Sequence, residues 1–337
     1  MSSESPSPNE SSHDVAPPSS RIDATDLSAA VDRIRDEIGT ILVGQTGMVD
    51  LFLTALFANG HVLIEGVPGV AKTLTARLIA RALDVDFTRI QFTPDLMPSD
   101  VLGTSVFNPK TTEFAFRKGP IFSNVVLIDE INRAPAKTQA ALFEVMEERQ
   151  VSADGTTWPL DVPFVVFATQ NPLEHEGTYR LPEAQLDRFL FKIQVDYPNL
   201  EEEIDILRGH DAGRGPEAIE QVEPVLEANS LLRYRALVSD VHVEPDLMRY
   251  IAEVTHRTRE HRMLSLGASP RASVALLNAG KAFAMLRGRD FVSPEDVQAI
   301  APAALRHRLM LTPEQEMEGR TTDEVVRRVL DEVDVPR

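Results

Sequence analysis

The feature that most constrains this chain is a short apolar run that leads into a glycine-rich turn and then into a helix. Residues 61–65 read HVLIE, which predicts a buried strand. The turn GVPGVAKT follows at residues 66–73, and residues 72–83 have a helical pattern. The turn is close to the phosphate-binding pattern G-x-x-x-x-G-K-[ST], so a nucleotide is expected where the strand meets the helix.

The residue types in this turn suit the binding of phosphate. Small residues let backbone N–H groups curve around phosphate oxygens, and the start of the following helix adds partial positive charge. Lys72 is expected to contact the β and γ phosphates, and the hydroxyl of Thr73 to hold magnesium. Ala71 stands where glycine is usual, and alanine tolerates positive φ poorly. An ordinary Gly/Pro turn that caps a helix is the alternative interpretation.

Two adjacent carboxylates follow a second apolar run. Residues 125–128 read VVLI, and Asp129 and Glu130 come next. A strand of this kind would deliver Asp129 beside the phosphate loop, where it supports the magnesium shell. Glu130 could then polarise the attacking water. The alternative is a strand that ends in a solvated acidic turn.

Three further polar residues have positions that suit ATP hydrolysis. Asn171 follows the strand predicted over 164–168 and could hold the same water or the γ phosphate, although an Asn before proline is also a common turn residue. Arg188 comes just before the strand predicted over 189–195, and Arg271 lies at the start of a later helix. Arginine stabilises the charge that spreads over the γ-phosphate oxygens, but a surface ion pair is the commoner fate of each.

Strands that alternate with helices predict a parallel sheet covered on both faces. Two stretches have the pattern of hairpins inserted into this α/β domain, near 103–120 and 150–163. After Pro198 the pattern changes, and from Ala228 onward it is helical with no strand-like run. The predicted division is a disordered Ser/Pro-rich tail at 1–20, a nucleotide-binding domain at 21–200, a linker at 201–224 and a helical domain at 225–337.

Composition excludes several classes of protein. The chain has no cysteine, which excludes disulfides, thiol catalysis and cysteine-ligated metals. The formal net charge of −18 argues against a broad electrostatic surface for nucleic acid. No segment approaches the roughly 20 apolar residues that span a bilayer, and the tail lacks the apolar stretch of a secretory signal. A cytoplasmic protein without membrane insertion is therefore expected.

The motifs occur in the order of the functional positions of AAA+ ATPases, and the chain resembles that superfamily. The corresponding positions are Walker A at 66–73, Walker B at Asp129 and Glu130, sensor 1 at Asn171, the arginine finger at Arg188 and sensor 2 at Arg271. Within it the chain is similar to the MoxR family, by the stretches EGVPGVAKT (65–73), RIQFTPDLMPSDVLG (89–103), IDEINRA (128–134) and LPEAQLDRF (181–189). The resemblance covers roughly 22–311.

The resemblance implies a P-loop parallel sheet between helices, followed by a small all-α lid domain. It implies that ATP and Mg²⁺ are the cofactors, and that the chain forms a homo-oligomeric ring, expected to be a hexamer. Thr73 and Asp129 are the expected metal-binding residues. The expected catalytic residues are Lys72, Glu130, Asn171, Arg188 and Arg271. The expected nucleotide-binding residues are Val43, Gly44, Gly66, Pro68, Gly69, Val70, Ala71, Lys72, Thr73 and Leu74.

The same resemblance implies a mechanism and a role. ATP would lie between the sheet domain and the lid, with Arg271 acting within its own subunit and Arg188 on the ATP of the neighbouring subunit. The two hairpins would be the helix-2 insert and the pre-sensor-1 hairpin, which face the ring pore and touch a client. Members of the family act as chaperone-like remodellers of protein partners, and many work with a protein that carries a von Willebrand factor A domain.

Three other functions stay open from the residues alone. One is a magnesium-chelatase-like ATPase subunit, and another is a nucleic-acid motor, which the acidic balance disfavours. The third is a non-hydrolysing nucleotide switch. The presence of Glu130, Asn171 and Arg188 counts against a switch.

Overall fold

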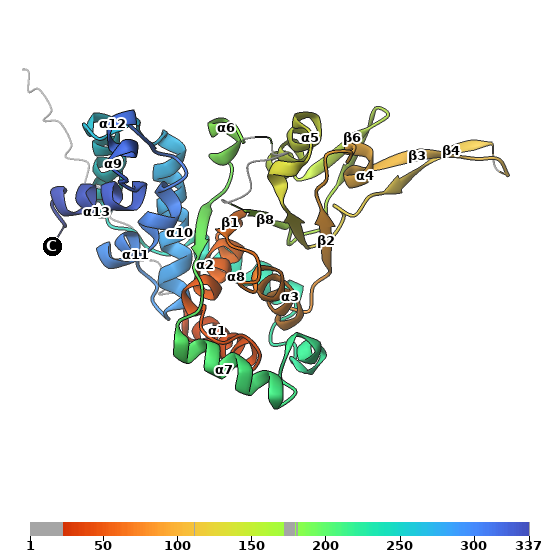
Figure 1. The fold of residues 1–337 in the computed structure, drawn as a ribbon, viewed down its shortest axis with the longest axis horizontal. Helices are drawn as coiled ribbons and strands as arrows, with labels where there is room; N and C mark the ends of the chain where they lie inside the picture. The colour runs from red at the N-terminus through yellow and green to blue at the C-terminus, as the bar shows by residue number, and fades with distance from the viewer. Residues whose placement is uncertain (1–22, 111, 172–178, 180, 337) are drawn as a thin grey trace, which may run out of the picture.

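A five-stranded parallel sheet forms the centre of the protein (Figure 1). The structure is a computed structural model that describes residues 23–110, 112–171, 179 and 181–336, so the predicted tail at 1–20 lies outside the described residues. The strands, in their order across the sheet, are β2 (Phe87–Gln91), β5 (Val125–Asp129), β8 (Val165–Gln170), β1 (Val62–Gly66) and β9 (Phe191–Val195). The predicted α/β class with a parallel sheet is confirmed.

Both faces of the sheet are buried, which is why its central strands read as continuous apolar runs. Val62 and Ile64 contribute to one hydrophobic core, while Leu63, between them, contributes to the core on the opposite face. The first core is covered by α1 (Thr25–Gly39), α2 (Thr46–Phe57) and α3 (Lys72–Ala82), and the second by α5 (Ala136–Glu148).

Strand β2 is absent from the strands predicted above, and its position in the sheet explains why. It lies at the edge, pairs with β5, and has only two apolar residues, Phe87 and Ile90, among its five. Of its five residues only Ile90 is buried, so the strand lacks the apolar run by which the others are recognised.

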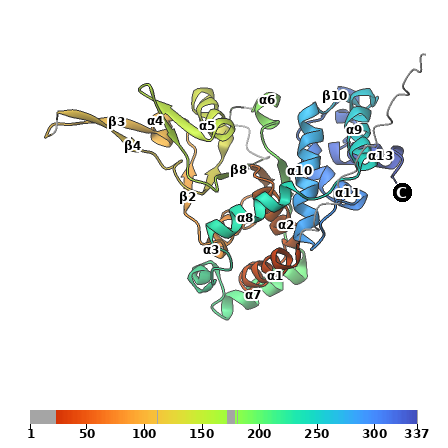
Figure 2. The same ribbon diagram turned by 180° about the vertical axis from the view of Figure 1, so that it is seen from behind.

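Two antiparallel hairpins extend from the sheet domain. The first is β3 (Gly103–Asn108) with β4 (Glu113–Lys118), beginning directly after α4 (Pro98–Leu102), and it projects far from the body of the protein (Figure 2). The second is β6 (Gln150–Ala153) with β7 (Thr156–Pro159). Asp154 and Gly155 form its turn with φ of 52° and 74°, the conformation that a two-residue hairpin turn prefers. The stacked rings of Phe116 and Trp158, with centroids 5.1 Å apart, connect the two hairpins.

The segment 201–224, expected to be a linker, is largely structured. It contains most of α7 (Leu200–Asp211) and the 3-10 helix η2 (Pro216–Gln221). Asn199 starts α7 through a capping box with Glu202, in which each side chain accepts a hydrogen bond from the backbone N–H of the other. A local cap therefore produces a helix just before the glycine-rich residues that suggest a linker.

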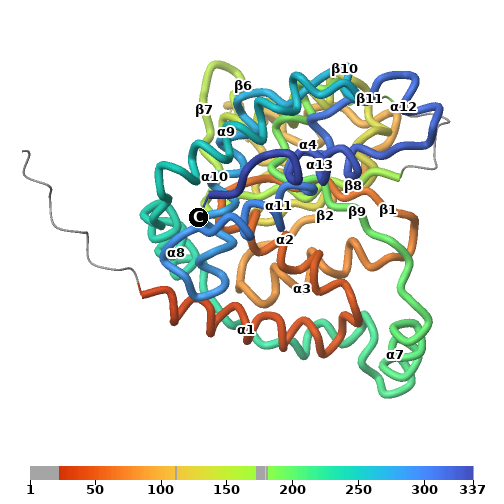
Figure 3. Tube along the Cα trace, turned by 90° about the vertical axis from the view of Figure 1, so that its left-hand side faces the viewer, coloured from red at the N-terminus to blue at the C-terminus, as the bar shows by residue number. Residues whose placement is uncertain are grey.

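Helices make up most of the remainder of the chain. They are α8 (Ala228–Ser239), α9 (Pro245–Glu260), α10 (Pro270–Leu286), α11 (Pro294–Leu305), α12 (Pro313–Met317) and α13 (Thr322–Glu332). Those from α9 onward lie beside the β9 edge of the sheet and face the viewer in Figure 3, while α8 packs on α2. α11 contacts β9, and α10 contacts α1 and α2. The prediction of no strand after Ala228 is wrong, because β10 (Leu264–Leu266) and β11 (Met310–Leu311) pair antiparallel. They are too short to show a strand pattern in the sequence. No helix in the described part of the chain is long and apolar enough to cross a membrane.

Candidate active site

The loop between β1 and α3 has a backbone suited to holding phosphate groups. Gly69 has φ of 89° and Ala71 has φ of 58°, so two residues of the loop adopt left-handed conformations. A side chain at Gly66 would come within 2.7 Å of the carbonyl oxygen of Val195, which explains glycine there. Among the described residues, no backbone hydrogen bond is donated by the N–H groups of Gly69, Val70 or Ala71. These donors fit the oxygens of a phosphate.

Lys72 starts α3 and reaches back over the loop. Its Nζ donates to the carbonyl oxygens of Gly66 at 2.5 Å and of Val67 at 3.0 Å. Burial lowers the pKa of Lys72, and the negative charges of Asp129 and Glu130 oppose that shift. The loop follows β1 and the acidic pair ends β5, with only β8 between these parallel strands, so the loop and the acidic pair lie at the same edge of the sheet and belong to one site. Thr73 and Leu74 follow in the first turn of the same helix.

Asp129 ends β5 and is buried. Its two carboxylate oxygens accept hydrogen bonds from Thr169 Oγ1 at 3.1 Å and from Arg89 Nε at 2.5 Å. A buried carboxylate that is fixed by two donors beside a lysine has the chemistry of a magnesium-supporting residue, because Mg²⁺ prefers oxygen ligands.

Glu130 lies just beyond the strand in a left-handed conformation, with φ of 57° and ψ of 54°. Its backbone N–H donates to Thr169 Oγ1 at 3.0 Å, which fixes this uncommon conformation. Its side chain accepts from Gln91 Nε2 at 2.8 Å and pairs with Arg133 Nε at 3.1 Å. The carboxylate is thus held at the carboxyl edge of the sheet, near the predicted position of the γ phosphate.

Asn171 follows β8, the strand that lies between β5 and β1. Carboxyl ends of neighbouring parallel strands meet at one edge of a sheet, so Asn171 lies at the same edge as the loop and the acidic pair. Val43 and Gly44 lie in the turn between α1 and α2. Gly44 has φ of 67°, and a side chain there would meet the carboxylate of Glu202 at 2.6 Å, so the start of α7 covers this turn.

The two predicted arginines lie elsewhere. Arg188 Nη1 donates to the carbonyl oxygen of Phe143 on α5. Arg271 Nη2 pairs with Glu147 Oε1 at 3.1 Å, near the end of the same helix. Both arginines line an open cavity of about 340 Å³, together with Gly60 and His61 at the amino end of β1.

The position of Arg271 does not fit the expectation that it contacts ATP within its own subunit. The phosphate loop follows the carboxyl end of β1, and five strand residues span roughly 17 Å. The lid packs beside the opposite end of that strand, where α10 begins. ATP at the loop would therefore not lie between the sheet and Arg271 of the same chain.

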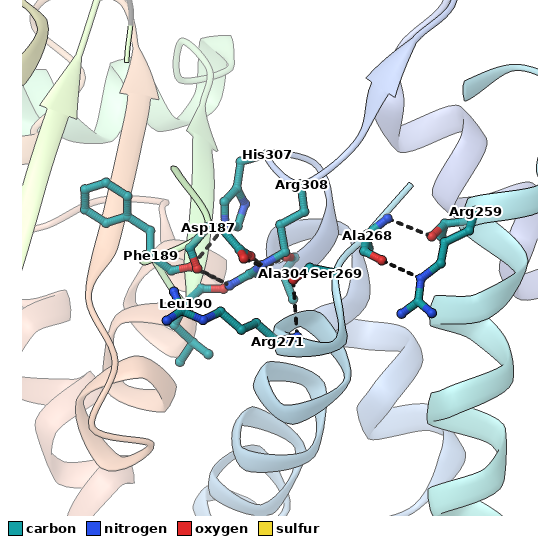
Figure 4. Close-up of polar contacts among 11 residues, drawn as sticks. Asp187, Phe189, Leu190, Arg259, Ala268, Ser269, Arg271, Ala304, His307 and Arg308 are labelled. Atoms are coloured by element: carbon teal, nitrogen blue, oxygen red, sulfur yellow. Dashed lines mark hydrogen bonds and ion pairs between the residues drawn. The ribbon is translucent and has the colours of Figure 1, made fainter. Parts of the chain in front are cut away.

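A buried ion pair fixes the segment that contains Arg188 to the lid (Figure 4). Arg308 Nε lies 2.7 Å from Asp187 Oδ1, and the same guanidinium donates to the carbonyl oxygens of Phe189 at 2.7 Å and Leu190 at 3.1 Å. Ser269, just before α10, also donates to Asp187 at 3.0 Å. Burial lowers the pKa of Arg308, and the carboxylate of Asp187 opposes this shift.

The sequence analysis did not identify several residues that support this site. Arg89 and Gln91 contact the acidic pair from β2, and their spacing of two would have placed them on one face had β2 been recognised. Thr169 contacts both Asp129 and Glu130 from the end of β8. Asp187 and Arg308 are far apart in the sequence, and no local pattern identifies them as partners.

Comparisons with known proteins agree with this arrangement. The model of the ATPase family associated with various cellular activities (AAA) matches residues 61–191, and the model of the AAA lid domain matches residues 256–329. YeaC of Bacillus subtilis is 48% identical over 311 residues, covering 92% of this chain and 96% of that protein. Chaperone MoxR1 of Mycobacterium tuberculosis is 45% identical over 316 residues, covering 91% of this chain and 82% of that protein. A crystal structure from Cytophaga hutchinsonii, of a chain assigned to the ATPases, is 41% identical with a TM-score of 0.86, and covers 93% of this chain and 97% of its own.

Proposed function

Since the chain belongs to the MoxR family of AAA+ ATPases and is therefore an ATP-hydrolysing enzyme, we propose that it works as a magnesium-dependent ring ATPase that remodels a protein partner. The family membership expected from the sequence is confirmed by the relatives and the domain matches. The roles of single residues, the ring and the partner are our proposals.

The observation that carries the proposal is the meeting of the phosphate loop after β1 and the acidic pair at the end of β5 at one edge of the parallel sheet, where the charges of Asp129 and Glu130 act on the pKa of Lys72. Lys72 and the free N–H groups at 69–71 hold the triphosphate, and Thr73 and Asp129 hold magnesium. Magnesium supplies charge neutralisation at the phosphates when bound. Glu130 takes the proton of the attacking water, and Asn171 orients that water. Val43 and Gly44 flank the adenine.

The arginines act on the ATP of a second copy of the chain. Arg188 and Arg271 share one cavity beside the amino end of β1, while the phosphate loop lies at the carboxyl end. Both guanidinium groups are therefore available to a neighbouring subunit and remote from their own loop. A single protomer then lacks the arginine charge that stabilises the transition state, so turnover requires assembly into a ring. We expect this ring to have six members.

The partner is a protein. Support comes from the relative named Chaperone MoxR1 and from the projecting hairpins, which expose Phe107 and Phe114 near the far end of the β3–β4 hairpin. Aromatic side chains at the end of a projecting hairpin suit contact with a client polypeptide. A protein with a von Willebrand factor A domain is the partner class we propose, in the cytoplasm.

Subunit mixing tests the proposal. Arg188→Ala and Lys72→Ala protomers should each be nearly inactive alone, because one lacks the arginine finger and the other lacks the phosphate-binding lysine. Mixed in equal amounts they should regain up to about a quarter of wild-type phosphate release, since intact loops then face intact arginines at some interfaces. Arg249→Ala, a change at an arginine with 77% side-chain exposure on the lid, is the control and should keep full activity. No recovery on mixing, in rings of confirmed mixed composition, would contradict action across subunits.

A further inference from the structure

Helix α5 connects Glu130, the residue proposed to activate water, to the β6–β7 hairpin. It starts at Ala136, just after Glu130 and the 3-10 helix η1 (Ile131–Arg133), and ends at Glu148, two residues before β6. The residue proposed to activate water in one site and the β6–β7 hairpin are therefore joined by a single helix of 13 residues. A contact anywhere along α5 can therefore influence both Glu130 and the hairpin.

The last turns of α5 contact both arginines. Phe143 accepts a hydrogen bond from Arg188 through its carbonyl oxygen, and Glu147 pairs with Arg271 at 3.1 Å. Residues 143 and 147 are four apart, so they lie one above the other on the same face of the helix. One face of α5 thus holds the two side chains that are proposed to act on the neighbouring ATP.

Glu147 is the carboxylate that pairs with Arg271 in the described part of the chain. Asp187 lies close by, but its carboxylate is already occupied by Arg308 and by the hydroxyl of Ser269. The two ion pairs also differ in burial. The side chains of Arg271 and Glu147 are 57% and 47% exposed, against 4% and 19% for Arg308 and Asp187. Exposed ion pairs contribute little to stability and exchange partners readily, whereas buried ones persist.

We propose that Glu147 is a positioning residue that holds Arg271 against α5 until the phosphate of a neighbouring subunit's ATP displaces its carboxylate. This rests on the proposed action of Arg271 across the subunit interface. Both partners are anions that accept hydrogen bonds from the same guanidinium, so the two compete. A phosphate in a water-excluded interface is the stronger partner, and the exchange frees the end of α5 beside the β6–β7 hairpin.

Competition predicts a specific kinetic effect. Removing the charge of Glu147 leaves Arg271 without its resting partner, so less ATP is needed to engage it. Glu147→Gln should lower the half-saturating ATP concentration of the assembled enzyme about two- to fivefold, the size that an exposed ion pair allows. The turnover number should stay within about twofold, because Arg271 and Glu130 are unchanged. Glu147→Asp keeps the charge and should lie between wild type and Glu147→Gln.

The experiment compares phosphate release by the full-length enzyme across ATP concentrations. Glu144→Gln is the matched control, since Glu144 is exposed and lies one turn earlier on the same helix. It forms no ion pair with any residue that the structure describes. Glu144→Gln should match wild type. In the Arg271→Ala background, Glu147→Gln should have no further effect, because Glu147 acts through that arginine.

The possible results separate the two proposals. If Arg271→Ala impairs hydrolysis and Glu147→Gln leaves the half-saturating concentration unchanged, Arg271 acts across the interface but Glu147 does not position it. If Glu147→Gln has the same effect with and without Arg271, the positioning role is also overturned. If Arg271→Ala leaves both kinetic constants at their wild-type values, the proposed role of Arg271 fails, and the role of Glu147 with it.

Discussion

The ion pair between Asp187 and Arg308 should contribute more to stability than any exposed ion pair of this protein. Asp187→Asn keeps an oxygen at the same place, so it can still accept from Ser269, but it removes the charge that compensates Arg308. Arg308 has 4% side-chain exposure and Asp187 19%. Breaking a buried pair by removing one partner costs about 3–5 kcal/mol. Arg308 keeps its hydrogen bonds to carbonyl oxygens at 187, 189 and 190, so we expect the lower end, about 3 kcal/mol.

Urea unfolding followed by circular dichroism measures this loss, as a shift of the midpoint at unchanged slope. The control is Glu147→Gln, which removes one partner of an exposed pair and should cost less than about 1 kcal/mol. A midpoint of Asp187→Asn equal to that of Glu147→Gln would refute the reasoning from burial. Phosphate release should also fall in Asp187→Asn, because the changed residue precedes Arg188.

Three further predictions follow from the site and the core. Ala71→Gly should raise stability by roughly 1 kcal/mol and keep nucleotide binding, because glycine adopts φ of 58° without strain. Ala71→Val should weaken the binding of a fluorescent ATP analogue. Gln91→Ala should change the turnover number more than nucleotide affinity, since Gln91 contacts Glu130; equal changes in both would contradict this role. Burial lowers the pKa of His61 to about 3 and that of His307 well below its usual value. Both are neutral when folded and gain protons on unfolding, so stability should fall as pH drops below about 6.5, by up to about 1.4 kcal/mol per unit for each. A flat urea midpoint between about pH 6.5 and about pH 5 would contradict this prediction.

The sequence predicts those parts of the site that depend on local pattern. The loop at 66–73 and the strand that ends at Asp129 are contiguous motifs, and the parallel sheet brings their ends together regardless of the residues between them. The capping box of Asn199 and Glu202 was also a readable local signal for α7. The glycine-rich residues after it led to the interpretation as a linker.

Other features depend on contacts between distant residues, and no local pattern encodes them. Strand β2 is an edge strand whose polar residues are explained only by their partners Asp129 and Glu130. The position of the lid depends on the packing of α10 against α1 and α2 and of α11 against β9. The apolar faces of α10 and α11 predict that they are buried, but not the surface on which they are buried. The motif of Arg271 therefore does not predict that this residue lies near the amino ends of the strands rather than near their carboxyl ends.

The difference in burial between the two ion pairs also decides which parts of the protein move together. The segment 187–190 is fixed to Arg308, and Ser269 at the start of α10 donates to the same Asp187. Arg188 and Arg271 are thereby attached to one unit, made of the lid and the segment before β9. Two contacts connect that unit to α5: the hydrogen bond from Arg188 to the carbonyl oxygen of Phe143, and the exposed pair of Arg271 with Glu147. A force that separates the lid from α5 should therefore break these two contacts before the buried pair of Asp187 with Arg308. The two arginines would then keep their relative positions and reach a neighbouring phosphate as a preformed pair.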